Sequence, residues 1–310
     1  MDIDQLAVLR ELADRGSITD VAAAIHKSPS AVSQQLRTLQ RQVGVVLVER
    51  DGRGVRLTEA GRALAASSVT IATAVAEAEA TWQAFQGGAT GPVRIAFFPS
   101  AAELLVPGLL TRMRTHPGIT LEAADRDVSQ DDFAALTADF DIVIAHRSDD
   151  VLAPADGPLV RVPLLREPID VALPLHHPLA DRGSLAISQI IGEDWIGVES
   201  GFPIDRVLQT MAVQAGVPAR VVYRSIHLPL IENLVVAGHG IALMPRHTTA
   251  HRARGRFALV PISNVRAGRH LEALMRPDRA ARLAVRTVLD EVRAEAEAQS
   301  SATTAIVTNA

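Results

Sequence analysis

Apolar residues recur at helical spacing through the N-terminal part of the chain, in three short runs and one long run. The short runs cover residues 4–15, 18–25 and 28–41, and each places its apolar side chains on one side of a helix. Ser28 is placed to cap the third helix, with Pro29 at its first position, where a missing N–H has no cost. The pattern predicts two short helices joined by a tight turn, with a further helix covering them.

The other side of the third predicted helix is polar and carries no acidic residue between Lys27 and Arg41. Hydroxyl, amide and guanidinium groups on a helix with an apolar back suit the major groove of DNA, as in a helix-turn-helix. An ordinary amphipathic helix pair with a solvated face gives the same pattern, so this motif alone leaves both interpretations open. The polar groups belong to Ser30, Ser33, Gln34, Arg37 and Arg41.

A short basic hairpin, or wing, is predicted after Gly44. Residues 45–50 form an apolar strand, and the glycines at 52 and 54 supply a turn. Three arginines place positive charge beside the helix pair, within reach of phosphates or of an adjacent minor groove. A solvated surface turn is the alternative. The arginines are Arg50, Arg53 and Arg56.

One long helix is predicted from a cap at Thr58 to about Phe85. Its apolar positions alternate spacings of four and three, which is a heptad seam with one polar interruption at Ser68. Such a helix at the edge of a small domain needs a partner, and we expect a second copy of the chain. Packing against the rest of the chain is the alternative. The seam consists of Leu64, Ile71, Val75, Ala78 and Trp82, followed by Phe85.

After a glycine-rich linker at residues 87–92, strand and helix signals alternate, which predicts parallel sheets with helices on both faces. Residues 299–310 are expected to be a disordered tail. The expected strands are residues 93–98, 119–124, 140–145, 160–165, 169–173, 195–198, 220–223, 241–244, 257–262 and 270–275, with a proline joining the fourth and fifth. The expected helices are residues 101–115, 130–138, 204–216, 228–238 and 279–298.

Composition narrows the class of protein. The chain has 310 residues, enough for two or three domains, and a formal net charge of −4, so any nucleic-acid footprint must be local. The absence of cysteine excludes disulfides and thiolate metal sites and suits a reducing cytoplasm. The N-terminus does not have the pattern of a signal peptide, and no apolar run is long enough to span a bilayer. We therefore expect a cytoplasmic protein without a membrane partner.

No enzymatic constellation is evident. His247 and His251 have metal-pair spacing but no third ligand, which favours an ordinary surface helix. Gly238 and Gly240 lack the third glycine of a dinucleotide fingerprint, and Ser200 does not lie in a nucleophile elbow. We expect no catalytic residue, no metal and no cofactor, and predict that the protein is not an enzyme.

The run from residue 17 to 61, together with LPLHHPLA (173–180) and VVAGHGIALMP (235–245), resembles the LysR-type transcriptional regulators. The resemblance implies an α/β protein with an all-α N-terminal part: a winged helix-turn-helix (1–58), a dimerisation linker helix and hinge (59–91) and an effector-binding domain (92–298). That domain resembles a periplasmic binding protein, with two α/β lobes joined by two crossover strands. Lobe one would comprise residues 92–166 and 264–298, and lobe two residues 167–263.

For DNA contacts, two departures from the family pattern matter. Pro29 stands where the family often has a base-reading glutamine, and Gln40 stands where glutamate is usual. Because Pro29 cannot hydrogen-bond a base, we expect Ser30, Ser33 and Gln34 to read bases. The resemblance also implies a phosphate contact by Arg37 and a minor-groove contact by Arg53 in the wing, with Ser28 and Arg50 beside them.

The resemblance further implies a small organic effector of unknown identity between the lobes, just after the lobe strands. Arg147 and His227 are the expected partners for an anion, whereas Glu199 would suit an amine, so the sign of the ligand stays open. A capping or surface role is the alternative for each residue. The candidates are Ser100, Ala101, Arg147, Ser148, Glu199, Ser200, Gly201, Phe202 and His227.

Taken together, these expectations describe a ligand-responsive, sequence-specific DNA-binding regulator. The resemblance implies a dimer of dimers on double-stranded DNA and contact with RNA polymerase. One alternative is an architectural DNA-binding protein without an effector. Another is an enzyme or solute-binding protein with an incidental helical N-terminus.

Overall fold

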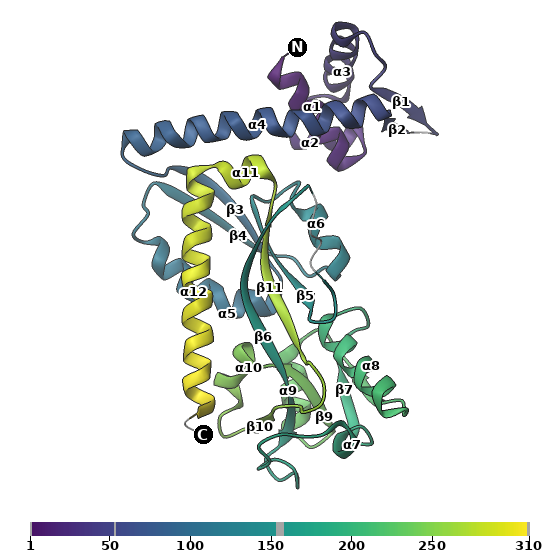
Figure 1. The fold of residues 1–310 in the computed structure, drawn as a ribbon, viewed down its shortest axis with the longest axis vertical. Coiled ribbons are helices and arrows are strands. Elements are labelled where there is room, and N and C mark those ends of the chain that lie inside the picture. Colours follow the sequence, from purple (N-terminus) through teal and green to yellow (C-terminus); the bar gives the residue numbers. More distant parts are fainter. Residues whose placement is uncertain (1, 53, 153–157, 309–310) are drawn as a thin grey trace.

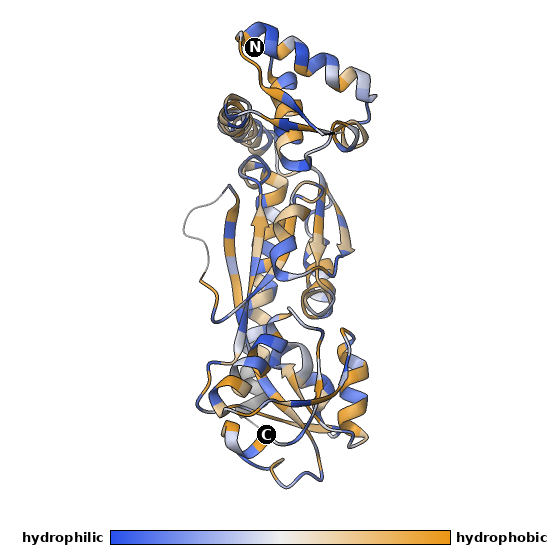
Figure 2. Cartoon of the chain, turned by 90° about the vertical axis from the view of Figure 1, so that its right-hand side faces the viewer, coloured by the Kyte–Doolittle hydropathy of each residue, from blue (hydrophilic) through white to orange (hydrophobic). Residues whose placement is uncertain are grey.

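The computed structural model of the chain describes residues 2–52, 54–152 and 158–308. Three bodies are stacked along the long axis, with the N-terminal helices at one end (Figures 1 and 2). The first body contains α1 (Ile3–Arg15), α2 (Ile18–Ala24), α3 (Pro29–Val43) and the hairpin of β1 (Val48–Asp51) and β2 (Gly54–Leu57). The long helix α4 (Glu59–Gln86) crosses the molecule alongside this body, between α3 and α11 in Figure 1.

Local sequence signals define the ends of the first helices. The side chains of Asp2, Ser17 and Ser28 accept hydrogen bonds from backbone N–H groups of the first turns of α1, α2 and α3. Gly16 and Gly44 end α1 and α3 with left-handed φ values of 69° and 71°, which glycine adopts without strain. Leucines and valines from all three helices then form one small core.

The other two bodies share one mixed sheet with the strand order β4-β3-β5-β11-β6-β9-β7-β8, and β10 pairs with β6. Strands pair in parallel within each half, whereas β6 and β11 run antiparallel to their neighbours and cross between the halves. The strands are β3 (Gly91–Phe97), β4 (Ile119–Asp125), β5 (Ile142–Ser148), β6 (Val160–Pro174), β7 (Asp194–Gly197), β8 (Arg220–Arg224), β9 (Ile241–Pro245), β10 (Phe257–Val260) and β11 (Gly268–Met275).

Helices cover the sheet and divide it into two cores. Lobe one is the core around β3, β5, β11, α5 and α12, and lobe two is the core around β7, β9, α8 and α9. The strands of both lobes are largely hydrophobic (Figure 2). The remaining elements are α5 (Pro99–Met113), the 3-10 turn η1 (Gln130–Asp132), α6 (Phe133–Leu136), α7 (Ile187–Ile190), α8 (Pro203–Ala215), α9 (Leu228–Val236), α10 (Arg246–Ala253), α11 (Pro277–Ala281) and α12 (Leu283–Thr308).

Two expectations about strands and tail are wrong. The two strands expected at residues 160–173 are one continuous strand, β6, because Pro168 pairs with Gly268 where the strand passes from one lobe to the other. The tail expected to be disordered continues α12 to Thr308, and only residues 309–310 lie outside the described residues. Gln299 donates to Glu295 one turn earlier in the same helix. Thr303 is buried, so packing outweighs the low helix propensity of this Ser/Thr-rich segment.

Two helices also differ from expectation. The helix expected at residues 279–298 is divided, because Arg282 is extended and separates α11 from α12. The helix that carries His247 and His251 is not a plain surface helix, since four of its residues are buried against both lobes: Thr248, Thr249, Ala250 and Ala253.

Candidate nucleic-acid interface and ligand cleft

The outer face of α3 presents exposed polar side chains and no acidic residue. Gln34 and Arg37 are exposed and lie beside a shallow hollow at the end of the helix. Ser28 acts as the helix cap and shares a hydrogen bond of 2.9 Å with Ser30. The hydroxyl of Ser33 donates to the Pro29 carbonyl at 2.9 Å, so it is already engaged by its own helix. Gln34 and Arg37 are therefore the side chains of this face most available to a ligand.

Gln40 has a role that the sequence did not reveal. Its Oε1 accepts hydrogen bonds from the backbone N–H groups of Leu47 (2.8 Å) and Val48 (2.9 Å), at the start of the hairpin. A neutral amide oxygen thus connects α3 to the wing and sets their relative position. The departure from glutamate at this position therefore lies at the junction between α3 and the wing, away from the outer face of α3.

The predicted hairpin is present, with Val48 paired to Leu57 and Asp51 paired to Gly54. Arg50 is exposed at its tip, whereas Arg56 forms an ion pair of 2.8 Å with Glu49. Arg53, for which we expected a minor-groove contact, lies outside the described residues. Among the described residues of the wing, Arg50 is therefore the arginine that can reach a phosphate without breaking an ion pair.

Helix α4 carries two apolar faces. Ile71 (38 % exposed), Val75 (39 %) and Trp82 (58 %) lie on one face, which includes Ala78 and leads to the 81 % exposed Phe85. Leu64 is half-buried at its beginning. The second face is turned towards the rest of the chain and contacts α1 and α11. It contains Ala76, Ala80 and also Ser68, whose hydroxyl donates to the Ala65 carbonyl. Ser68 therefore belongs to the intramolecular face, and Leu64 packs partly against the core of the first body, so the exposed seam runs from Ile71 to Phe85.

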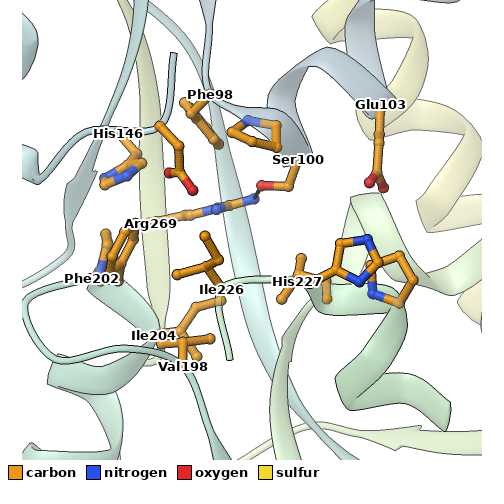
Figure 3. Close-up of a pocket in the computed structure, with 15 residues that line it drawn as sticks. Phe98, Ser100, Glu103, His146, Val198, Phe202, Ile204, Ile226, His227 and Arg269 are labelled. Atoms are coloured by element: carbon orange, nitrogen blue, oxygen red, sulfur yellow. Dashed lines mark hydrogen bonds between the residues drawn. The ribbon is translucent and has the colours of Figure 1, made fainter. Parts of the chain in front are cut away.

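A cleft with a cavity volume of about 70 Å³ lies between the two lobes and opens to solvent (Figure 3). The N-terminal ends of α5, α8 and α9 border it, with β5 and β11 at its base. Its wall is largely apolar. The lining residues are Phe98, Pro99, Ser100, Glu103, Asp127, His146, Val198, Phe202, Pro203, Ile204, Ile226, His227, Leu228, Pro229 and Arg269.

His146 lies in an aromatic surround at one end of the cleft. Its ring meets Phe98 and Phe133 edge-on, with both centroids 4.8 Å away, and Phe202 lies at 6.3 Å. Burial lowers the pKa of His146 to about 3, and the charge of Arg269 contributes to the shift, so the imidazole is neutral at pH 7. Its Nδ1 atom is buried without a hydrogen-bond partner among the described residues. An unpartnered buried ring nitrogen is uncommon in a folded protein, and this one belongs to a residue that lines the cleft.

Arg269 connects both lobes at the base of the cleft. Its Nε and Nη2 donate to Glu167 at 2.9 and 2.7 Å, and Nη2 also donates to the Ser100 hydroxyl at 3.0 Å. Glu167 accepts in addition from the backbone N–H and hydroxyl of Thr248 in lobe two. The guanidinium stacks over the Phe98 ring at 5.1 Å. Its charge is therefore compensated by a carboxylate that is itself fully buried.

Of the residues expected at the ligand site, Ser100, Phe202 and His227 line the cleft. Ala101 is instead buried in the core of lobe one, and Ser148 bonds Gln130 through its backbone N–H. Glu199, Ser200 and Gly201 are exposed in the loop before α8 and are not among the lining residues.

Arg147 was expected to face the ligand, and the structure places it elsewhere. It donates to the Val151 carbonyl and lies 3.9 Å from Glu272, in a separate hollow. The cause is the alternation of a strand: His146 and Arg147 are neighbours in β5, so their side chains leave on opposite faces. His146 takes the cleft face.

Arg269 was missed by the sequence analysis. Its partner Glu167 is 102 positions away in the chain, and no spacing rule links two crossover strands. The available signal was the position of this arginine directly before the strand expected at residues 270–275. Among the described residues, no group of histidine and acidic side chains is placed to hold a metal ion. In the same part of the chain, no helix is long and apolar enough to cross a membrane.

Family models match both parts of the chain. The bacterial regulatory helix-turn-helix proteins of the lysR family match residues 3–62, and the LysR substrate binding domain matches residues 86–297. A hydrogen peroxide-inducible genes activator of Pectobacterium carotovorum is 27% identical over 297 residues, which cover 94% of this chain and 96% of that protein. The dual regulator GltC of Bacillus subtilis is 25% identical and covers 84% of this chain and 86% of its own length.

Solved structures show the same fold. A full-length, cysteine-substituted OxyR of Pseudomonas aeruginosa has a TM-score of 0.68 at 18% identity, with 96% of this chain and 94% of that chain covered. Full-length CbnR in complex with its target DNA has a TM-score of 0.52 at 19% identity, with 96% and 100% covered. The chain belongs to the LysR family of DNA-binding transcriptional regulators, with a helix-turn-helix domain followed by a ligand-responsive effector-binding domain.

Proposed function

We propose that this regulator reads DNA with the outer face of α3 and that a small effector in the interlobe cleft controls the outcome. The observation that carries the first part is the exposed, acid-free face of α3 with Gln34 and Arg37 free to contact a duplex. An amide can pair with the edge of adenine, and a guanidinium neutralises a phosphate or pairs with guanine. The wing supports this arrangement with the exposed Arg50.

For the effector we propose a small, largely apolar molecule with one hydrogen-bonding group. The cleft wall is apolar, and the unpartnered Nδ1 of His146 offers a single buried polar contact. Polyanions are disfavoured because Glu167 already neutralises Arg269, while Asp127 adds negative charge to the lining and Glu103 is paired with Arg252. Burial raises the pKa of Asp127, which indicates a partly desolvated carboxyl that would resist a second anion.

We propose that the effector binds reversibly and without thiol chemistry. The chain contains no cysteine, so it can form neither a sulfenic acid nor a disulfide. Its relatives include proteins named as hydrogen peroxide-inducible activators. Whatever signal this chain receives, the oxidation of a cysteine cannot convey it.

We propose that the chain dimerises through the exposed seam of α4 and that two dimers assemble into a tetramer. The supporting observation is the row of exposed apolar side chains on one face of a 28-residue helix whose other face is already packed. Paired copies would present two α3 helices to successive major grooves of an inverted repeat. Contact with RNA polymerase and a cytoplasmic location, where bacterial DNA lies, complete the proposal.

A gel-shift experiment tests the core of this proposal. The purified chain is titrated onto the DNA upstream of its own gene, with excess competitor DNA at about 0.15 M salt, because affinity depends on salt. A discrete band that resists competitor is the expected result. A smear that disappears with competitor, on this DNA and on genomic fragments selected by the protein, would contradict sequence-specific reading.

A further inference from the structure

Helix α1 of the DNA-binding domain rests on lobe one of the same chain through a cluster of ion pairs. Arg276, at the start of α11, lies between two carboxylates of α1: its Nη1 is 3.1 Å from Glu11 Oε1, and its Nη2 is 2.9 Å from Asp14 Oδ2. Arg10 of the same helix lies 3.2 Å from Asp278. We call this cluster, together with the contacts of Arg15, the α1 clasp.

Arg15 extends the clasp to a second part of lobe one. Its Nη2 donates to the Ala138 carbonyl and to Asp139 Oδ1, both at 2.8 Å, while its Nε donates to Glu11 within α1. In Figure 1, α11 lies directly beneath α4, and α4 contacts both α1 and α11. The DNA-binding domain therefore touches its own effector domain at two sites, each built from opposite charges.

The ion pairs of the clasp are expected to stabilise the docked state only weakly, as a contact that forms and releases requires. Arg276 (7 % exposed) and Glu11 (12 %) are largely buried, whereas Asp14 (37 %) and Asp139 (56 %) remain partly open to solvent. Burial lowers the pKa of Arg10 and raises the pKa of Asp14, which means that both charged forms lose hydration in this interface. Desolvation of this kind offsets most of the attraction of an ion pair, while the loss of one partner remains costly. The clasp is thus specific in geometry but only weakly stabilising overall.

One strand joins the clasp to the ligand cleft. Arg276 directly follows β11, and Arg269 stands near the opposite end of that strand, at the base of the cleft. The two residues are seven positions apart, about 23 Å in an extended strand. β11 is paired on both sides, with β5 and with β6, along almost its whole length. A strand held in this way moves as a unit, so a shift at Arg269 displaces Arg276.

We propose that the α1 clasp is a regulatory contact, through which β11 transmits the state of the cleft to the orientation of the DNA-binding domain. The proposal rests on the proposed function in one respect, because it takes the cleft as the effector site. Movement of Arg269 away from Ser100 or Glu167 shifts Arg276 relative to Glu11 and Asp14. The clasp then tightens or releases, which changes the angle of α3 and the half-site spacing of a dimer.

The test measures the distance between the two domains in solution. Because the chain has no cysteine, cysteines introduced at the exposed Asp20 in α2 and Asp131 in η1 are the only thiols available for spin labels. Pulsed electron resonance then gives the distance distribution, and hence the ratio of docked to undocked molecules. We expect Arg276→Gln to lower that ratio at least about tenfold, because Glu11 and Asp14 lose the guanidinium they share, and Arg15 is left as a partner for Glu11 alone.

Controls separate the clasp from general effects. Arg286→Gln removes the same charge from an exposed position on α12 and should leave the distances unchanged. In a double-mutant cycle, Glu11→Gln combined with Arg276→Gln should have less effect than the sum of the two single changes. Raising the salt from about 0.1 M to 1 M shortens the Debye length from about 10 Å to 3 Å and should broaden the distribution without any substitution in the clasp. If the interdomain distance distribution is unchanged both in Arg276→Gln and at high salt, the proposed regulatory role of the clasp is wrong.

The link to the cleft is tested with Ile226→Trp, which places an indole at a half-exposed cleft position as a stand-in for an occupant. We expect it to shift the interdomain distance in the otherwise native chain and to have no further effect in the Arg276→Gln background. No shift in the native chain, or an equal shift in both backgrounds, overturns transmission through β11. These measurements need neither DNA nor effector, so failure of the clasp and failure of the gel shift are separate results.

Discussion

At the scale of single residues, the DNA-facing side chains differ in what they can do. Ser33 is engaged by the Pro29 carbonyl and Ser28 by the helix N-terminus, whereas Gln34 and Arg37 are exposed. Side chains that are free of internal partners reach a base or a phosphate without first breaking a hydrogen bond. Gln34 and Arg37 are therefore the two residues to substitute. An amide that reads a base contributes sequence specificity, whereas a guanidinium on a phosphate contributes affinity for all DNA.

Gln34→Ala should relax base preference at one position of the site, at a cost of roughly 1–3 kcal/mol on the specific sequence, because a bidentate amide contact is lost. Arg37→Ala serves as the comparison: it should weaken binding to all sequences and reduce the salt slope by about one. Fluorescence anisotropy at several salt concentrations distinguishes the two. Equal losses on specific and random DNA for Gln34→Ala would exclude its base-reading role.

His146 makes lobe one sensitive to acid. Its pKa in the fold is about 3, below the value of 6.5 for a free imidazole, so the unfolded chain binds the extra proton first. Stability from this residue is present above pH 6.5 and is lost as pH falls towards 3. Between pH 6.5 and 4.5 the loss is on the order of 2–3 kcal/mol. His146→Phe should reduce this loss, as measured by urea unfolding at both pH values. Identical pH dependence in the two proteins would contradict the assignment.

At the scale of elements, the sequence predicted most helices and strands because their signals are local. Ser28 and Thr58 act as caps, as their positions suggested, and Ser17 caps α2 in the same way. What could not be predicted depends on partners distant in the chain. The continuity of β6 past Pro168 follows from the place of this strand between β11 and β9. The Arg269–Glu167 pair likewise exists only because two crossover strands meet.

The two faces of α4 lead to a prediction about assembly. Ile71→Asp with Val75→Asp places two charges on the exposed apolar seam, where a partner helix would have to bury them, so the double variant should be monomeric. Ala66→Asp with Thr70→Asp changes exposed positions away from the seam and should leave assembly intact. Sedimentation velocity measures both. A double seam variant that sediments like the parent would show that the seam is not the interface.

At the scale of the whole molecule, α12 spans more of the structure than the sequence suggested. It contacts α5 and β3 in lobe one, the crossover strand β6, and α10 beside lobe two. Its last turns were expected to be a disordered tail, yet Thr303 is 4 % exposed. Composition alone does not indicate what a helix packs against, so this end of the chain could not be predicted.

Ending the chain after Ala298 tests the contribution of this extension. The shortened protein should lose roughly 1–3 kcal/mol of stability, since a buried part of α12 is removed. Differential scanning calorimetry of the full and shortened chains measures the change. A chain shortened after Ser301, which retains the Gln299–Glu295 hydrogen bond, should lose less. Equal melting temperatures for all three proteins would show that the extension adds nothing.

The separation of polar and apolar groups around the cleft has a consequence for how this regulator can change. The polar contacts at its base, Arg269 with Glu167 and Ser100, belong to the crossover strands and the start of α5. Much of the apolar wall, including Phe202, Ile204 and Ile226, belongs to lobe two. Exchange of these wall residues alters the shape that is accepted and leaves the connection between the lobes intact. New ligand preferences are therefore open to stepwise selection or design, with the response machinery retained at each step.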